Sequence, residues 1–209
     1  MKKSKVIDPV RRQQICNLIK EQFPSVYQDS DTLPQAYHGT NVSAIVLGAD
    51  PVNVAYNKRF EYVFGLEKKN SPYFSVTKRN LKKIGLTLDN IYVQNVIQNY
   101  FKVETSNNKY WYECALLWLD YLKDEIDSHF DREVPVFVTA QKVLKALIGK
   151  EAVKAYPPDS IYSKSKFFTL EENYLGRNVF CLFRHRDYSL SKWKDYREAL
   201  IMHLSAKQS

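Results

Sequence analysis

The polar side chains of this sequence with the most chemical potential each follow a predicted strand. They are Asp50, in "SAIVLGADPVN", then Asn95, Thr139 with Gln141, and finally His185 in "FRHRDYS". The carboxyl ends of parallel strands meet along one edge of a sheet, where α/β proteins bind ligands. A carboxylate, an amide, a hydroxyl and an imidazole gathered there can hold a planar polar ligand with a charge and a water beside it.

Each of these residues also has a purely structural interpretation. Asp50 precedes Pro51, and the pair can stabilise a turn or cap a following helix. Asn95 can satisfy backbone groups at a strand end. A lone histidine such as His185 is more often a structural hydrogen-bonding group than a catalyst. The functional interpretation depends on their convergence.

The elements that must position these residues alternate between strand and helix. Apolar and β-branched runs predict strands at 43–49, 91–95, 134–139 and 178–183, and helical spacing predicts helices at 109–126, 141–148 and 191–204. Strands that alternate with helices indicate a parallel sheet covered on both faces. We therefore expect a three-layer α/β/α sandwich around a central, four-stranded, mainly parallel sheet.

Sequence signals also place the remaining segments. Asp8 and Pro9 predict the start of a helix that ends near Pro24, with Ile15, Leu18, Ile19, Gln22 and Phe23 on one face. We expect a loop up to Thr40, a further crossover helix within 72–86, and an irregular segment at 150–176. The 209 residues predict one domain, with an N-terminal helix and loop at 1–40 and a core at 41–205.

Composition limits the class of protein and its partners. The chain has 31 Lys and Arg against 23 Asp and Glu, a formal net charge of +8, which favours a polyanionic partner such as nucleic acid. Cys16, Cys114 and Cys181 are far apart and predict reduced core thiols rather than a metal site. The sequence has neither a signal-peptide pattern nor a long apolar segment, so we expect a cytoplasmic protein away from the membrane.

Aromatic and basic residues follow the first predicted strand. Phe60, Tyr62 and Phe64 alternate in "RFEYVFGL", which predicts a strand with rings that stack on a base or fill the core. The basic residues of the same region are Lys58, Arg59, Lys68, Lys69, Lys78, Arg79, Lys82 and Lys83. They indicate either a solvated face or a phosphate-contacting surface.

The motifs "VLGADP", "YVQN" and "FRHRDYSLS", in this order, make the chain resemble the uracil-DNA glycosylase superfamily. That family has a strand followed by Gly-x-Asp-Pro, a middle strand that ends in Asn, and a final strand followed by a His-Pro-Ser-type loop. The resemblance covers roughly residues 40 to 205.

The resemblance implies a reaction and roles for individual residues. Such enzymes turn a damaged base out of DNA and hydrolyse its glycosidic bond without a cofactor. Asp50 would orient water and stabilise positive charge on the sugar, and His185 would donate to the carbonyl oxygen of the departing base. The implied substrate-binding residues are Gly48, Ala49, Pro51, Val52, Phe64 and Asn95. The implied DNA-binding residues are Arg184, Arg186, Ser189 and Ser191.

Two departures from the family pattern affect this expectation. Val52 stands where the family's most familiar motif has a Tyr that blocks bases larger than uracil, which predicts a pocket that is wider or differently specific. Arg186 and Asp187 replace the Pro-Ser after His185, which weakens the expectation of an intercalating loop. Asp187 can also pair with His185 and favour an imidazolium.

Three hypotheses follow. The first is a monomeric DNA base-excision glycosylase that acts on uracil or another altered base. The second is a catalytically inactive protein of the same fold that binds nucleic acid. The third is a small-molecule enzyme that uses the sheet edge for a nucleoside or other polar ligand.

Overall fold

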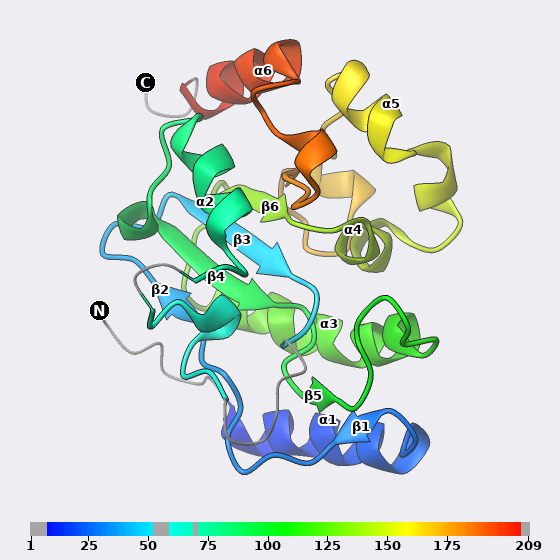
Figure 1. The fold of residues 1–209 in the computed structure, drawn as a ribbon. Coiled ribbons are helices and arrows are strands. Elements are labelled where there is room, and N and C mark those ends of the chain that lie inside the picture. The colour runs from blue at the N-terminus through cyan, green and yellow to red at the C-terminus, as the bar shows by residue number, and fades with distance from the viewer. Residues whose placement is uncertain (1–7, 52–58, 69–70, 206–209) are drawn as a thin grey trace.

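The computed structural model describes residues 8–51, 59–68 and 71–205, which form a mixed α/β fold (Figure 1). Its main sheet has five strands in the order β2-β4-β3-β6-β7. Their bounds are Tyr37–His38 for β2, Ala44–Gly48 for β3, Ile91–Asn95 for β4, Val136–Val138 for β6 and Val179–Cys181 for β7. The last four are parallel to one another, whereas β2 pairs antiparallel with β4.

The four predicted strands are therefore present and parallel, but the expected strand count was wrong. The fifth strand, β2, lies inside the segment predicted to be a loop. The same segment contains β1 (Tyr27–Gln28), which pairs with β5 (Tyr100–Phe101) in a separate two-stranded sheet. Strands of two residues are too short to show an alternating pattern.

Helices lie on both sides of the sheet. α1 (Pro9–Gln22), α3 (Trp111–Asp127) and α4 (Gln141–Ile148) pack in sequence, with α3 against both of the others. α2 (Ser75–Lys82) lies nearer to α6 (Lys194–Ser205) than to α1, as Figure 1 shows. α6 also contacts α5 (Pro158–Ser163). All five residues of β3 are buried, as expected for a strand covered on both faces.

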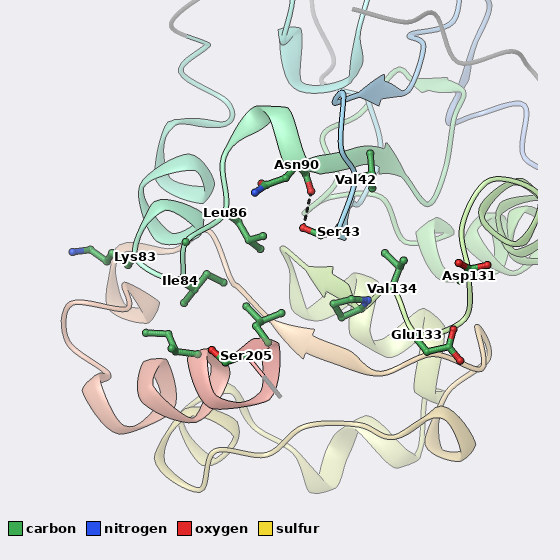
Figure 2. Close-up of a pocket in the computed structure, with 14 residues that line it drawn as sticks. Val42, Ser43, Lys83, Ile84, Leu86, Asn90, Asp131, Glu133, Val134 and Ser205 are labelled. Atoms are coloured by element: carbon green, nitrogen blue, oxygen red, sulfur yellow. Dashed lines mark hydrogen bonds between the residues drawn. The ribbon is translucent and has the colours of Figure 1, made fainter. Parts of the chain in front are cut away.

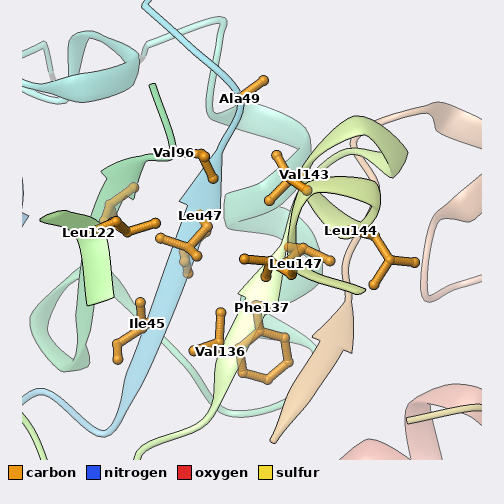
Figure 3. Packing of buried hydrophobic residues seen from close by; sticks show 14 of the residues in the cluster. Ile45, Leu47, Ala49, Val96, Leu122, Val136, Phe137, Val143, Leu144 and Leu147 are labelled. Atoms are coloured by element: carbon orange, nitrogen blue, oxygen red, sulfur yellow. The ribbon is translucent and has the colours of Figure 1, made fainter. Parts of the chain in front are cut away.

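The core joins both helices of one layer to the central strand. Figure 3 shows Leu122 of α3 and Leu147 of α4 gathered around Leu47 of β3, and all three belong to the buried apolar cluster. The three cysteines are free and buried. The described part of the chain contains no helix that is both long and apolar enough to cross a membrane.

The first helix begins as its sequence signals predict, but two of its positions were assigned wrongly. The Asp8 carboxylate accepts a hydrogen bond from the Arg11 amide at 2.9 Å, and Pro9 occupies the first turn. Ile15 and Ile19 are buried, whereas Leu18 is 42% exposed and Gln22 is exposed as well. Cys16 takes the inward position instead.

Candidate functional site

The carboxyl ends of β3 and β4 lie side by side, because Gly48 is paired with Asn95 in the parallel register. Asp50 follows Gly48 by two residues, and Val96 and Ile97 donate backbone hydrogen bonds to the carbonyls of Gly48 and Ala49. The sheet edge predicted from the sequence therefore brings the first two candidate residues together.

The Asp50 carboxylate is held by donors from a distant part of the chain. Its Oδ1 accepts hydrogen bonds from Thr105 Oγ1 at 2.8 Å and from Trp111 Nε1 at 2.7 Å. Thr105 precedes α3, and Trp111 is the first residue of that helix. These contacts fix the position of the carboxylate on the sheet edge, which neither a turn nor a helix cap requires.

Burial raises the pKa of Asp50 to about 6. The hydrogen bonds from Thr105 and Trp111, and then the positive charges of Lys142 and Arg184, act in the opposite direction. Desolvation penalises the ionised carboxylate, and the donors and cations stabilise it. Asp50 is therefore mostly ionised at neutral pH but has a pKa close to the range in which a general base operates.

Two cations accompany this single carboxylate. Lys142, in the first turn of α4, donates a hydrogen bond from Nζ to the Thr105 carbonyl, and burial lowers its pKa. Burial also lowers the pKa of Arg184, which follows β7 and whose backbone amide donates to the carbonyl of Thr139, the residue after β6. Asp50 opposes both shifts. These three side chains carry a net positive charge, which suits an anionic ligand or product.

Gly48, Asn95 and Phe64 meet immediately beside this group. A Cβ on Gly48 would lie 2.3 Å from Asn95 Oδ1 and 2.3 Å from Phe64 Cζ, closer than atoms can approach. Glycine is therefore needed for the amide and the ring to converge on the strand end. Asn95 Oδ1 is buried, and no hydrogen-bond donor reaches it from the residues that the structure describes. An unpaired buried carbonyl is costly and indicates a place where a ligand donor is expected.

Phe64 reaches this position through an unusual backbone conformation. Its φ of 58° and ψ of 10° lie in the left-handed region, and Gly65 follows with a φ of 65°. Ser71 Oγ donates a hydrogen bond to the Phe64 carbonyl, and the Phe74 ring packs on Phe64 with centroids 5.2 Å apart. Strained backbone of this kind is often retained at functional sites.

The strand predicted for residues 60–64 is therefore wrong. A short 3-10 helix, η2, spans Val63–Gly65, and Tyr62 makes only an isolated bridge to Gln35. The left-handed turn at Phe64 and Gly65 prevents an extended conformation. The three rings consequently separate: Phe64 points to the site, Tyr62 is buried, and Phe60 contacts Tyr73.

Arg184, predicted to bind DNA, lies at the candidate site itself. Its guanidinium carbon is 5.4 Å from the centroid of the Phe64 ring, and its charge acts on Asp50. It thus connects the aromatic ring with the carboxylate.

His185, predicted to be catalytic, has different surroundings. Its side chain is 64% exposed, and Nδ1 lies 3.1 Å from the Asp187 carboxylate, which also pairs with Lys192. The pairing with Asp187 expected from the sequence is confirmed. Among the described residues, the contacts of His185 are with Asp187 and Tyr188, not with Asp50 or Phe64.

The other predicted DNA-binding residues lie in a short structured connection. Arg186 begins a 3-10 helix, η6 (Arg186–Tyr188), and is exposed, as is Ser191. The half-buried Ser189 accepts hydrogen bonds through its carbonyl from Lys192 and Trp193, and the Leu190 amide donates to Asn80 of α2. The segment after His185 is thus fixed to α2.

The remaining predicted residues have structural contacts or lie outside the described ranges. Ala49 and Pro51 are buried, and Thr139 Oγ1 donates to the Leu47 carbonyl at 2.9 Å, which binds β6 to β3. Val52 lies outside the described residues. Thr105, Trp111 and Lys142 were not predicted at all. Only the position of Lys142, in the first turn after a strand end, could have suggested it.

A cavity of about 760 Å³ lies at the opposite end of the strands (Figure 2). Val42 and Ser43 line it just before β3, and Val134 and Pro135 line it just before β6. It therefore opens at the amino ends of the strands, away from Asp50 and Asn95, and does not belong to the candidate site.

No protein-family model matches the chain, and no curated protein matches its sequence. The function is therefore inferred from the fold and from the site.

Proposed function

We propose that the protein is a DNA glycosylase that hydrolyses the N-glycosidic bond of uracil or another altered base turned out of DNA. The observation that carries this proposal is the convergence of a braced carboxylate, an unpaired amide oxygen and an aromatic ring at one sheet edge. The net charge of +8 supports a polyanionic substrate. The order of the Gly-Ala-Asp-Pro, Asn and His segments supports the same class.

The base is proposed to stack on Phe64 with its edge directed toward Asn95. The Phe64 ring offers a face on which any base can stack. Asn95 Oδ1 is free to accept a hydrogen bond from an N–H group on the edge of the base. In a duplex, base pairing would occupy that N–H group. Gly48 allows the ring and the amide to lie this close together.

Asp50 is proposed to orient the attacking water and to stabilise positive charge on the sugar. The water oxygen bonds to C1′, the glycosidic bond breaks, and its electron pair leaves with the base nitrogen. The water proton passes to Asp50 or to solvent. A carboxylate with a pKa of about 6 is ionised at neutral pH and can accept this proton transiently.

Arg184 is proposed to stabilise the departing base. The base carries negative charge as the bond breaks, and the half-buried guanidinium lies over the Phe64 ring on which the base would stack. Fixed donors aimed at developing charge are usually the largest electrostatic contribution to such reactions. This role was assigned to His185 by the family resemblance.

A base-release assay tests the proposal. Single- and double-stranded oligonucleotides with uracil or other altered bases are incubated with the protein, and the abasic product is detected by alkaline strand cleavage. We expect release from at least one substrate and a loss of about 10²- to 10⁴-fold in Asp50→Asn. Asp89→Asn, an exposed acid at the other end of the strands, is the matched control.

Equal activity of Asp50→Asn and the control would remove the glycosylase mechanism. Salt-sensitive DNA binding without release from any substrate would instead identify a nucleic-acid-binding protein of this fold.

A further inference from the structure

A basic cavity lies directly behind Phe64. It has a volume of about 320 Å³, and its apolar wall is formed by Leu66, Phe74 and Leu88. Phe74 also packs on Phe64, and Ser71, which lines the cavity, donates its hydrogen bond to the Phe64 carbonyl. Phe74 and Ser71 therefore connect the cavity with the Phe64 side of the candidate site.

The charge at this cavity is of one sign. Lys68 lines it from the loop, and Lys78, Arg79 and Lys82 line it from α2. Lys78 and Lys82 are four residues apart and occupy one face of the helix, where like charges repel. The sequence of α2 contains no acidic residue, and none of the described residues that line the cavity carries a carboxylate. An anion bound there would relieve this repulsion.

The combination of an apolar wall with a basic rim indicates the chemistry of the ligand. A basic face that only contacts solvent needs no apolar cavity beside it. A nucleotide, in contrast, presents a flat base and a phosphate together, which match an apolar wall and a basic rim. Bases stack on apolar and aromatic walls, and lysines neutralise phosphates. The volume is sufficient for a single base.

We propose that this cavity binds one nucleotide of the DNA strand that flanks the nucleotide held at Asp50, with Lys78 and Lys82 on its phosphate. The inference rests on the proposed function in taking DNA as the ligand. It goes beyond that function by placing a second, non-reacting nucleotide next to the site, which helps to hold the strand while the target base is turned out.

Fluorescence of 2-aminopurine tests the proposal without catalysis. Oligonucleotides carry a tetrahydrofuran abasic analogue at the target position and 2-aminopurine at successive neighbouring positions. We expect binding of the wild-type protein to raise the fluorescence severalfold at one position, because that base leaves its stack. Ser75→Trp, which fills the cavity without changing any charge, should abolish this rise.

The controls separate the cavity from charge and from folding. Ser75→Ala removes the hydrogen bond from Ser75 to the Pro72 carbonyl without filling the cavity, and it should keep the rise. Lys82→Glu and Lys83→Glu make the same change at adjacent, exposed positions, but Lys83 lines the distant cavity of Figure 2. We expect Lys82→Glu to weaken binding about tenfold and to reduce the salt dependence more than Lys83→Glu.

A fluorescence rise that persists in Ser75→Trp, or equal effects of Lys82→Glu and Lys83→Glu, would overturn the proposal. Thermal melting confirms that each variant is folded. Base release by the wild-type protein is measured separately. If the wild-type protein releases no base but still shows a fluorescence rise that Ser75→Trp abolishes, the glycosylase activity is wrong and the nucleotide site is retained.

Discussion

Arg184 and His185 are neighbours in the chain but have opposite surroundings. Successive side chains of an extended segment point to opposite sides, so only one of the two can face the strand ends. The Arg184 guanidinium interacts with Asp50 and Phe64, whereas the His185 ring is exposed and pairs with Asp187. The site therefore presents a permanent cation where the family resemblance implies an imidazole.

The presence of Arg184 instead of His185 beside Asp50 leads to a prediction about the chemical step. Arg184→Gln should slow single-turnover base release by about 10²- to 10³-fold at saturating enzyme, the usual effect of removing a donor to a developing anion. Arg184→Lys should restore part of the rate, because it keeps the positive charge. His185→Gln should change the rate only severalfold.

Single-turnover rates separate this effect from DNA affinity. A strong loss in His185→Gln together with a normal rate in Arg184→Gln would return the role to the histidine.

At the scale of elements, the outer edge of β7 is closed by side chains rather than by another strand. Tyr196 Oη accepts from the Cys181 amide at 3.0 Å and donates to the Cys181 carbonyl at 2.9 Å. Tyr162 Oη accepts from the Phe183 amide at 2.8 Å, and Phe168 makes a backbone bridge to Val179. These contacts protect the strand that delivers Arg184 from edge-to-edge association.

Tyr196→Phe should destabilise the protein without changing the fold. It removes both contacts with the buried Cys181 backbone and leaves the Cys181 amide unpaired, whereas the carbonyl keeps the hydrogen bond from Tyr162 Oη at 3.3 Å. The expected cost is about 1–3 kcal/mol. For a chain of this size we expect the Tm to fall by about 5 °C, measured by circular dichroism.

Tyr188→Phe is the matched control, since the hydroxyl of Tyr188 bonds to the exposed Asp159 carboxylate. An equal loss of stability in both variants would show that the Tyr196 hydroxyl does not stabilise the strand edge.

The predictability of the elements depended on their length. The α4 bounds of Gln141–Ile148 and the four parallel strands followed from apolar spacing. The segment 150–176, expected to be irregular, contains the short helices η4 (Ala152–Ala155), α5 and η5 (Leu170–Glu172). Elements of a few residues are stabilised by tertiary contacts rather than by their own periodicity, so the sequence shows little sign of them.

At the scale of the whole molecule, the buried carboxylate of Asp50 lowers the stability of the folded protein at neutral pH. The folded protein holds Asp50 with a pKa of about 6, above the ordinary value of 3.8. The folded state therefore binds the proton more tightly than the unfolded chain does. The stability contributed by protonated Asp50 is complete below pH ~4 and is lost as the pH rises through about 6.

Asp50→Asn should therefore stabilise the protein while removing its activity. We expect little difference from the wild-type protein near pH 4 and a gain of ~3 kcal/mol at pH 8, or about 9 °C in Tm. Urea and thermal unfolding at both pH values measure the effect. A variant that is less stable than the wild-type protein at pH 8 would contradict the assigned cost of the carboxylate.

The sequence alone determined the α/β class, the four parallel strands and the meeting of Asp50 with Asn95. These features follow from local apolar spacing and from the shared direction of parallel strands. Only the tertiary structure decided that Thr105, Trp111 and Lys142 surround Asp50, and that Arg184 rather than His185 faces it. Such contacts depend on how loops and helices pack and on which side of an extended segment each residue falls, and no local pattern records either.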